Sequence, residues 1–463
     1  MTVIVRPSGG RWAGVDYVGN QSVTNPALER NMVNDGFANW APGSGDDVVL
    51  PLQAIVTAAG DSKIVAPAAR ASVAEAAGGG QLPPYTGFVA DRQRSCFSFS
   101  ATHKYWQGRL GCYAMDDITP DTQMRVVEEG FYTTAAGEQP VGFNAQLMIE
   151  YPQGVYTPVT FSGASTGSVP AGGRLVSDPI SVTIPRFAKF WYCYYKSNAA
   201  GMIYVGGVNI PYSDHDNGDY YEFSATALTN KLGVGGYVNT DVNQGFASPP
   251  RAIIGTTSRR TVSIHGDSRS TGLLDHWGDK ARHRGMLERS ICPYFGNTNA
   301  SMASETTATL SGSGGALRRQ LSNDYASDIV INMGTNDLPS AQTISRLQTL
   351  IGQFPGKRVW LCTISPYTTS SDSWATIANQ TVQSNEAERV LANKWIRGKP
   401  AGVYGVFDIA DVVELARSGK WNPLYTSDPS QYTAFEGLHE TSLMCQAVAQ
   451  ARVIDPALLG FRA

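Results

Sequence analysis

Residues 261–272 read Thr-Val-Ser-Ile-His-Gly-Asp-Ser-Arg-Ser-Thr-Gly, a run of β-branched and apolar residues that breaks at Gly266-Asp267-Ser268. Such a run predicts a strand, and the small turn-forming residues after it predict a tight turn that presents the Ser268 hydroxyl. Many strands end in three residues of this kind, so the tripeptide alone carries little information. Its meaning depends on two motifs further along the chain.

Two motifs further along the chain also lie at the ends of predicted strands or helices. Gly334-Thr335-Asn336-Asp337 closes the apolar run 329–333, and Glu436-Gly437-Leu438-His439 stands just before the last predicted helix. Ligands of open parallel sheets bind at the carboxyl ends of the strands, where Ser268 and Asn336 are both expected. The order serine, asparagine and carboxylate-x-x-histidine resembles the SGNH (GDSL) hydrolase family.

The chain after Arg260 alternates between short apolar runs and helical stretches, which predicts a parallel sheet covered by helices on both faces. The predicted strands are Thr261–His265, Ile291–Gly296, Asp328–Met333, Val359–Thr363 and Val403–Ile409, and the predicted helices are Leu273–Arg289, Leu310–Leu321, Ala341–Phe354, Ile377–Arg397 and one after His439. The resemblance implies a flavodoxin-like order for this five-stranded sheet, within a three-layer α/β/α catalytic domain at residues 251–463.

The preceding part of the chain divides into two further regions, so the protein is predicted to be multidomain, α/β plus all-β. Residues 111–250 contain short alternating runs separated by Gly, Pro and Asn, which predict a β-sandwich or jelly-roll accessory domain. The segments Val159–Gly163 and Ser177–Pro185 resemble the accessory β-domain of some members of the family. Residues 1–110 are rich in Gly, Ala and Pro and predict an irregular region, either an attachment segment or a packing arm.

Composition excludes several function classes. The 463 residues include 36 Lys plus Arg against 39 Asp plus Glu, for a net charge of −3, so no basic stripe predicts a nucleic-acid partner. Charged residues make up only 16% of the chain, which favours a polar but charge-poor surface. No apolar run approaches the roughly 18 residues that would predict a membrane span. The sequence leaves open whether the chain forms a homo-oligomer.

The N-terminus and the cysteines bear on the compartment. Met1–Gly10 lacks the basic start and apolar core of a signal peptide, and we expect an extracellular protein whose signal is missing here or a virion-associated protein of a bacteriophage. The six cysteines lack the spacing of a zinc site and predict buried free thiols, with a Cys96–Cys112 bridge left open.

The chemistry implied by the resemblance is that of a serine nucleophile. Serine needs a neighbouring base and a third group that orients the base, and Ser268, His439 and Glu436 are expected to fill these roles. The usual acid of the family at this position is Asp, whereas this chain has Glu436. Asp428, or backbone carbonyl groups alone, are alternatives for the third member.

The resemblance also implies three donors for the oxyanion that forms when an ester carbonyl is attacked. They are the Ser268 backbone N–H, a backbone N–H after the second strand and the Asn336 side-chain amide. The segment 299–307 is similar to the family pattern Asn-x-Gly-x-x-Gly-x-Thr-Thr, which places Ser304 at the second glycine. A serine keeps the N–H, but it adopts a positive φ less readily than glycine does.

Other residues near these motifs are expected to support the site. Gly266, Asp267, Gly334 and Asp337 are predicted to fix the two strand-end turns. Arg269 is expected to face solvent, and His265, inside the first strand, is expected to be packed or hydrogen-bonded rather than to act as a base.

Together these residues predict a serine esterase that needs no metal or cofactor. Its predicted substrate is an acylated polysaccharide or oligosaccharide, from which it would remove short acyl groups, foremost O-acetyl, through an acyl-enzyme. One alternative is a lipid or aryl ester hydrolase. The other is a non-catalytic glycan-binding or structural virion protein with a decayed hydrolase fold, which the departures at positions 304 and 436 favour and the intact Ser268, Asn336 and His439 oppose.

Overall fold

A computed structural model describes residues 82–206, 218–235, 246–275, 283–337, 339–426 and 435–461, together with five short strands nearer the N-terminus. These strands are β1 (Val3–Val5), β2 (Gly10–Trp12), β3 (Val15–Tyr17), β4 (Ser22–Val23) and β5 (Ala38–Trp40). Strand β1 pairs antiparallel with β4 and β5, and β2 pairs with β3. The rest of residues 1–81 lies outside the described part of the chain.

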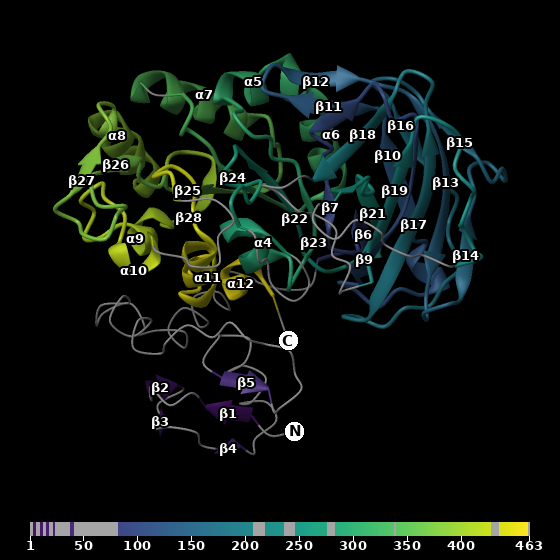
Figure 1. The fold of residues 1–463 in the computed structure, drawn as a ribbon, viewed down its shortest axis with the longest axis horizontal. Helices are drawn as coiled ribbons and strands as arrows, with labels where there is room; N and C mark the ends of the chain where they lie inside the picture. The colour runs from purple at the N-terminus through teal and green to yellow at the C-terminus, as the bar shows by residue number, and fades with distance from the viewer. Residues whose placement is uncertain are drawn as a thin grey trace.

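The predicted parallel sheet is present, and all its strands but one come from the C-terminal half of the chain (Figure 1). Its strands are β7 (Gln93–Arg94), β22 (Thr261–Gly266), β23 (Gly296–Asn299), β24 (Asp328–Asn332), β25 (Arg358–Cys362) and β28 (Val403–Phe407). All neighbours pair in parallel, in the order β28-β25-β24-β22-β23-β7. If β22 is counted as the first strand, the five predicted strands follow the flavodoxin-like order 2-1-3-4-5. Strand β7 is a sixth strand that the sequence analysis did not predict.

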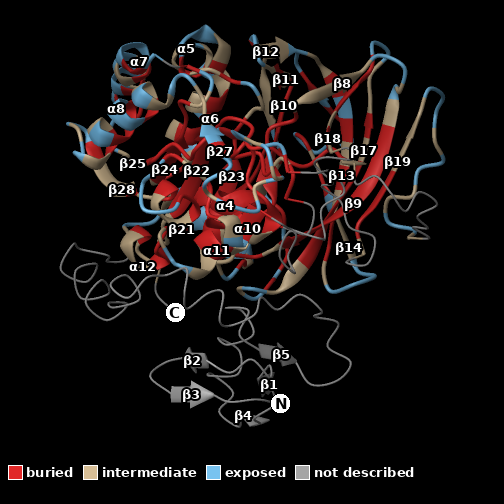
Figure 2. Cartoon of the chain, turned by 60° about the vertical axis from the view of Figure 1, so that its left-hand side comes forward, coloured by how far each residue is buried: buried red, intermediate tan, exposed pale blue. Residues whose placement is uncertain are grey.

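Helices cover both faces of this sheet. They are α4 (Gly285–Ile291), α5 (Thr307–Ser311), α6 (Ala316–Tyr325), α7 (Ser340–Gly352), α8 (Glu386–Arg397), α9 (Ala410–Val413), α10 (Pro423–Thr426), α11 (Ser442–Gln450) and α12 (Pro456–Leu459), with a 3-10 turn, η2 (Ser313–Gly315), between α5 and α6. Neighbouring residues of β24 point to opposite faces: Val330 shares a core with Val448 of α11, whereas Ile329 and Ile331 share one with Leu347 of α7. The arrangement is therefore the predicted three-layer α/β/α one, with its strands mostly buried (Figure 2).

Three predicted elements differ from the structure. The start of the helix predicted over Leu273–Arg289 is wrong, since residues 273–275 are not helical and α4, the first described helix after β22, begins at Gly285; residues 276–282 lie outside the described part of the chain. Gly272, Leu274 and Gly285 have φ values of +73°, +67° and +74°, a left-handed conformation that no α-helix tolerates.

The strand predicted over Ile291–Gly296 and the start of the helix predicted over Ile377–Arg397 are also wrong. Residue Ile291 ends α4, and β23 begins only at Gly296. Residues Gln380–Val382 form β27, which pairs antiparallel with β26 (Thr368–Ser370) before α8 begins at Glu386. In both places the apolar or β-branched run is too short for its pattern to distinguish a helix from a strand, and contacts with other parts of the chain determine its secondary structure.

Two larger antiparallel sheets occupy the part of the chain before β22, beside the smaller β8-β18-β20 sheet. One has the order β14-β13-β17-β9-β19, with β15 paired to β13, and the other has the order β16-β10-β21-β6. Val126 and Ile253 of the second sheet share one hydrophobic core with Leu147 and Tyr192 of the first, so the two sheets enclose a common interior as in a β-sandwich. The elements are β6 (Tyr85–Phe88), β8 (Ser98–Ser100), β9 (Tyr105–Tyr113), η1 (Pro120–Thr122), β10 (Arg125–Glu129), β11 (Phe131–Thr134), β12 (Gly137–Pro140), β13 (Phe143–Glu150), β14 (Tyr156–Val159), β15 (Gly167–Val169), β16 (Arg174–Val176), β17 (Lys189–Ser197), β18 (Met202–Gly206), β19 (Tyr220–Ser224), β20 (Phe246–Ala247) and β21 (Ala252–Thr257).

The β11–β12 hairpin departs from these sheets and lies over α5 and α6 of the α/β part (Figure 1). The all-β part and the α/β part thus meet through more than the connecting chain.

All six cysteines are free and buried, as predicted, and no Cys96–Cys112 bridge forms. Within the described ranges, none of the helices combines the length and the apolar character that a bilayer span requires.

Candidate active site

The turn after β22 presents Ser268 at the carboxyl end of the strand. The Asp267 carbonyl accepts the N–H groups of Ser270 and Thr271, each at 3.1 Å, and the Thr271 hydroxyl donates to the Ser268 carbonyl at 2.7 Å. A Cβ added at Gly266 would stand 2.8 Å from the Asn332 carbonyl oxygen, so the neighbouring strand β24 leaves space only for glycine. The predicted tight turn is therefore present.

Ser268, His439 and Glu436 lie in one chain of contacts. The Ser268 Oγ and His439 Nε2 atoms are 2.7 Å apart. The Nδ1 atom of His439 contacts the Glu436 carboxylate, whose Oε1 atom also accepts the His439 backbone N–H at 3.3 Å. A carboxylate against Nδ1 favours the tautomer with the proton on Nδ1, which leaves Nε2 free to accept the serine proton. Asp428, the alternative acid, lies outside the described residues.

The electrostatics of Glu436 suit this contact. The hydrogen bond with His439 lowers the pKa of the Glu436 carboxyl, partial burial opposes this shift, and the charges of His439 and Arg269 add to the lowering. Because the side chain is 46% exposed, this shift says little about stability. It does favour an ionised carboxylate beside the imidazole in the neutral pH range.

The loops that carry the other predicted donors converge on the same edge of the sheet. The Met302 N–H donates to the Gly266 carbonyl at 3.0 Å, and the Asn336 side-chain amide donates to the Glu305 carbonyl at 3.0 Å. An amide has two N–H bonds, so this contact orients the Asn336 side chain and leaves its second N–H for a ligand. Ser304 has a φ of +61°, the left-handed conformation that its glycine-like position requires.

The predicted supporting residues hold the two turns. The Asp337 carboxylate accepts the Thr307 N–H at 2.7 Å and so joins the Asn336 turn to the start of α5. Gly334 has a φ of +127°, and a Cβ there would stand 2.6 Å from Ile364. His265 is buried and lies 2.9 Å from the Ser322 hydroxyl of α6, and burial holds its pKa well below the usual range. His265 is thus a buried, hydrogen-bonded neighbour of α6, as predicted.

Arg269 was expected to face solvent, and this expectation is wrong. Its side chain is buried, lies 2.9 Å from the Glu440 carboxylate and donates to the Pro366 carbonyl at 2.8 Å. Arg269 follows Ser268 in the sequence and Glu440 follows His439, so this ion pair joins the two segments that must meet. Two opposite charges, each directly after a candidate catalytic residue, were the signal in the sequence that was missed.

Breaking this buried pair is expected to destabilise the fold. The variant Glu440→Gln leaves the Arg269 guanidinium buried without its counter-ion, and we expect the free energy of unfolding to fall by about 3 kcal/mol in urea titrations. Asp411→Asn is the matched control, because it removes an ion pair of the same 2.9 Å length in which the Arg417 side chain is 55% exposed. A loss of less than about 1 kcal/mol is expected there. Equal losses in the two variants would contradict the role given to the buried pair.

Asp267 is the buried carboxylate of the elbow, and its environment predicts a pH effect. Burial raises the pKa of the Asp267 carboxyl from 3.8 to about 6, although the Arg269 charge opposes the shift. The folded-state pKa lies above the unfolded one, so the wild type loses stability as pH rises through the window from 3.8 to about 6. Asp267→Asn keeps an acceptor for the Arg269 N–H and does not titrate.

The measurable quantity is the difference in unfolding free energy between Asp267→Asn and the wild type. We expect this difference to shift in favour of the variant by about 2 kcal/mol between pH 4 and pH 7 in urea titrations. A difference that stays constant with pH would show that Asp267 does not titrate in this window.

The structure is similar to several solved structures of carbohydrate esterases. A carbohydrate acetylesterase from Sinorhizobium meliloti is 15% identical, with a TM-score of 0.29, over 43% of this chain and 99% of that chain. A family two carbohydrate esterase from Cellvibrio japonicus is 11% identical, with a TM-score of 0.27, over 81% and 96% of the two chains. An acetyl xylan esterase from Butyrivibrio proteoclasticus is 12% identical, with a TM-score of 0.25, over 80% and 92%. No protein-family model and no curated protein sequence matches this chain.

Proposed function

We propose that this chain is a serine esterase of the SGNH type that removes short acyl groups, foremost O-acetyl, from a polysaccharide. The observation that carries the proposal is the 2.7 Å contact between Ser268 Oγ and His439 Nε2, on an imidazole whose other nitrogen contacts Glu436. A hydroxyl, a base and a carboxylate in this sequence of contacts form the arrangement that makes serine a nucleophile.

The first half of the reaction forms an acyl-enzyme. The Ser268 oxygen attacks the ester carbonyl carbon while His439 Nε2 takes the serine proton, and Glu436 stabilises the imidazolium that results. The carbonyl oxygen becomes an oxyanion, which we assign to the backbone N–H groups of Ser268 and Ser304 and to the second N–H of Asn336. When the tetrahedral intermediate collapses, the sugar oxygen leaves with the proton from His439, and the acyl group stays on Ser268.

The second half releases the acid. His439 Nε2 takes a proton from a water molecule, whose oxygen attacks the acyl carbonyl carbon, and the proton then returns to the Ser268 oxygen as the acyl bond breaks. No metal ion or cofactor enters either half of the proposed reaction.

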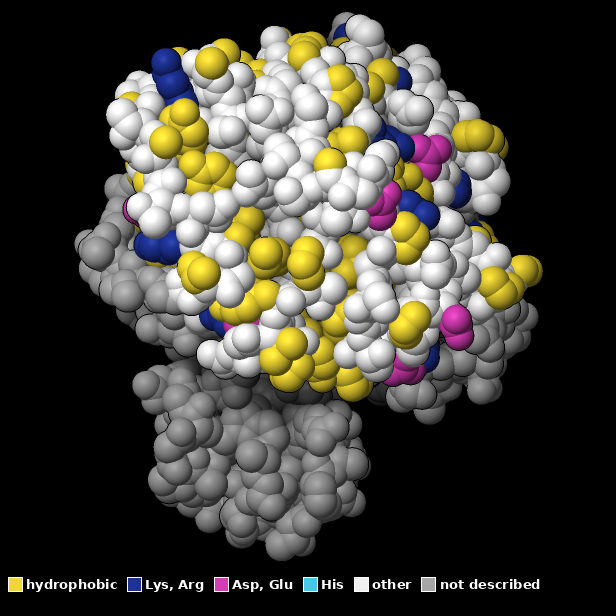
Figure 3. Space-filling model, turned by 90° about the vertical axis from the view of Figure 1, so that its right-hand side faces the viewer, with side chains coloured by type: hydrophobic (Ala, Val, Ile, Leu, Met, Phe, Trp, Pro, Cys, Tyr) yellow, Lys and Arg dark blue, Asp and Glu magenta, His cyan; other side chains and the backbone are white. Residues whose placement is uncertain are grey.

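The proposed polysaccharide substrate is supported by the low charge of the surface. Most side chains on the face formed by the two antiparallel sheets are uncharged (Figure 3), in keeping with a charged content of 16% for the whole chain. Such a surface suits a neutral, hydroxyl-rich polymer better than an anionic lipid interface. Location outside a cell, or on a virion, stays a prediction of the sequence analysis.

The test is acetate release from a panel of acetylated polysaccharides and from 4-nitrophenyl acetate, with mass spectrometry of the protein after treatment with a fluorophosphonate. We expect acetate from at least one glycan and a single adduct on Ser268. Activity only on long-chain or aryl esters would favour the lipid or aryl ester alternative. Glycan binding with neither hydrolysis nor an adduct would favour the decayed fold.

A further inference from the structure

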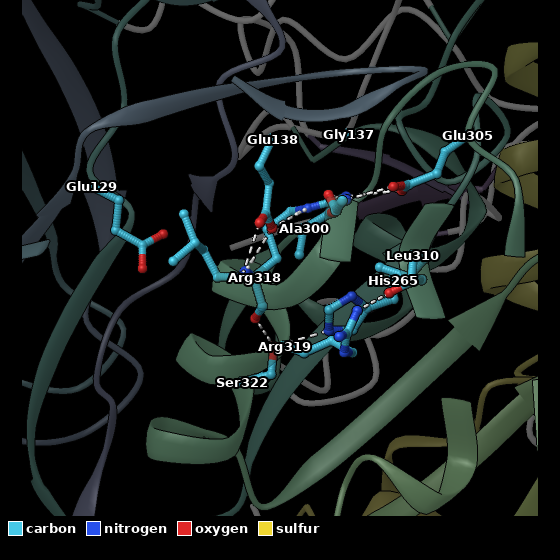
Figure 4. Close-up of polar contacts among 12 residues, drawn as sticks. Glu129, Gly137, Glu138, His265, Ala300, Glu305, Leu310, Arg318, Arg319 and Ser322 are labelled. Carbon is cyan, nitrogen blue, oxygen red and sulfur yellow. Dashed lines mark hydrogen bonds and ion pairs between the residues drawn. The ribbon is translucent and has the colours of Figure 1, made fainter. Parts of the chain in front are cut away.

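A buried arginine of α6, Arg318, lies at the centre of a network of polar contacts with Glu138, Ala300 and Glu305 (Figure 4). The Arg318 side chain is fully buried, and both of its terminal nitrogens contact the Glu305 carboxylate. One of these nitrogens also donates to the Ala300 carbonyl at 2.8 Å. A single guanidinium therefore holds the two ends of the loop 300–305.

This loop is the one that carries the oxyanion donors. Ser304 comes directly before Glu305, and the Asn336 amide donates to the Glu305 backbone carbonyl at 3.0 Å. The left-handed conformation of Ser304 costs about 1–3 kcal/mol, so surrounding contacts must hold it. The Arg318 contacts at Ala300 and Glu305 are placed on both sides of this strained residue.

The second carboxylate in the network comes from the all-β part of the chain. Glu138 lies on β12, and its Oε1 atom accepts the Arg318 backbone N–H at 2.9 Å and the Arg318 Nε–H at 3.2 Å. Its Oε2 atom accepts the Leu317 N–H at 2.9 Å. These are N–H groups of the first turn of α6, which has no earlier helical carbonyl to bond, so Glu138 caps the helix from another part of the protein.

The hairpin that carries Glu138 is held closely against the catalytic part. A Cβ at Gly137 would stand 2.5 Å from the Gly314 Cα atom, so the two backbones are in contact at this point. The Thr309 hydroxyl of α5 donates to the Ala135 carbonyl in the hairpin turn at 3.2 Å. The hairpin thus fixes both Glu138 and the segment between α5 and α6.

We propose that the β11–β12 hairpin acts, through Glu138 and Arg318, as a positioning element for the oxyanion donors Ser304 and Asn336. Glu138 orients the guanidinium, the guanidinium holds Glu305, and the Glu305 carbonyl holds the Asn336 amide. The all-β part would then be needed for the rate of the chemical step and not only for substrate binding. This inference rests on the proposed esterase function.

Glu138 is the informative residue to change. Loss of Arg318 would leave Glu305 buried without a counter-ion, which is expected to prevent folding. Loss of the Glu138 side chain leaves the Arg318–Glu305 pair intact, and it frees the Nε end of the guanidinium and the first turn of α6. Glu138→Ala and the closer isostere Glu138→Gln are therefore both used.

The experiment measures kcat and KM for 4-nitrophenyl acetate. The rates are divided by the concentration of active sites, which is determined in a separate sample by labelling with a fluorophosphonate to completion. It also measures the inhibition constant of an alkylboronic acid, which forms a tetrahedral adduct on the serine oxygen. In Glu138→Ala we expect kcat to fall about tenfold, a fraction of the 10²–10³ that loss of a whole oxyanion donor costs. We expect the boronate inhibition constant to rise in proportion and KM to stay within about twofold. Glu138→Gln is expected to show a smaller change in the same direction.

Asp324→Asn is the matched control. It breaks the 2.6 Å ion pair between Arg174 and Asp324, which also joins the all-β part to α6 but lies at the other end of the helix. We expect its kcat and boronate inhibition constant to match the wild type. Glu138 variants that lose thermal stability but keep kcat and boronate binding like Asp324→Asn would overturn the inference alone. If the wild type showed no hydrolysis that Ser268→Ala abolishes, the proposed function would be overturned, and the inference with it.

Discussion

Ser268→Ala is expected to lower kcat for ester hydrolysis by about 10⁶, down to the residual rate that binding and oxyanion donors support. The Ser268 hydroxyl is the group that contacts His439 Nε2, and alanine offers no nucleophile there. The fold should survive, because removing one hydroxyl at a turn leaves almost no cavity. Initial rates on 4-nitrophenyl acetate, with the melting temperature measured in parallel, give the comparison.

Ser270→Ala is the control for this variant. Ser270 lies in the same turn and is equally buried, and its hydroxyl has no hydrogen-bond partner within the described residues. We expect its kcat to stay within about twofold of the wild type. If Ser268→Ala kept the activity of Ser270→Ala, the hydrolysis would have to come from another group.

Glu436→Gln is expected to lower kcat by about 10⁴, the size of the effect when the acid of such a triad becomes an amide. Glutamine has nearly the same shape, but it carries no charge to stabilise the imidazolium. It can also turn its NH₂ group toward His439 Nδ1, which favours the wrong tautomer. The measurement is kcat at neutral pH, with fluorophosphonate labelling to confirm that Ser268 is still accessible.

Glu436→Asp separates the effect of the negative charge from the effect of side-chain length. Aspartate keeps the carboxylate but is shorter by one methylene, so we expect its kcat to lie between those of the wild type and Glu436→Gln. Near wild-type activity in Glu436→Gln would mean that Asp428 or backbone carbonyls supply the third member instead.

The strand and the turn that carry Ser268 were predicted from local signals, whereas the strand order was implied by the family resemblance. An apolar run that ends in Gly266-Asp267-Ser268 can hardly form anything but a strand and a turn, and parallel strands bring their carboxyl ends to one edge. The pairing of His439 with Glu436 followed from a spacing of three residues. The contact between Ser268 and His439 is different, because it joins residues 171 positions apart and was implied by the resemblance rather than by local pattern.

The features that sequence reasoning missed are contacts between distant segments. Arg269 and Glu440 each look like ordinary surface charges until the fold brings them together, and Glu138 is 180 residues from the backbone N–H of Arg318 that it accepts. The start of the helix predicted over Leu273–Arg289 was wrong for another reason: the left-handed backbone of Gly272, Leu274 and Gly285 excludes a helix at these positions. The local sequence pattern does not reveal which distant residues will meet or which residues will adopt a left-handed conformation.

Strand β7 decides where the protein can be cut. It follows β6 in the chain and precedes the other strands of the all-β part, yet it pairs with β23 at the edge of the parallel sheet, and its Arg94 donates to the Thr271 carbonyl in the turn after Ser268. A fragment that begins at residue 251 would hold all three proposed triad residues but would lack this strand. The edge of β23 would then expose unpaired N–H and C=O groups, which promote aggregation through pairing with strands of other molecules. A fragment that keeps this sheet edge paired therefore begins upstream of β7 and includes the all-β strands that lie between β7 and β22 in the chain.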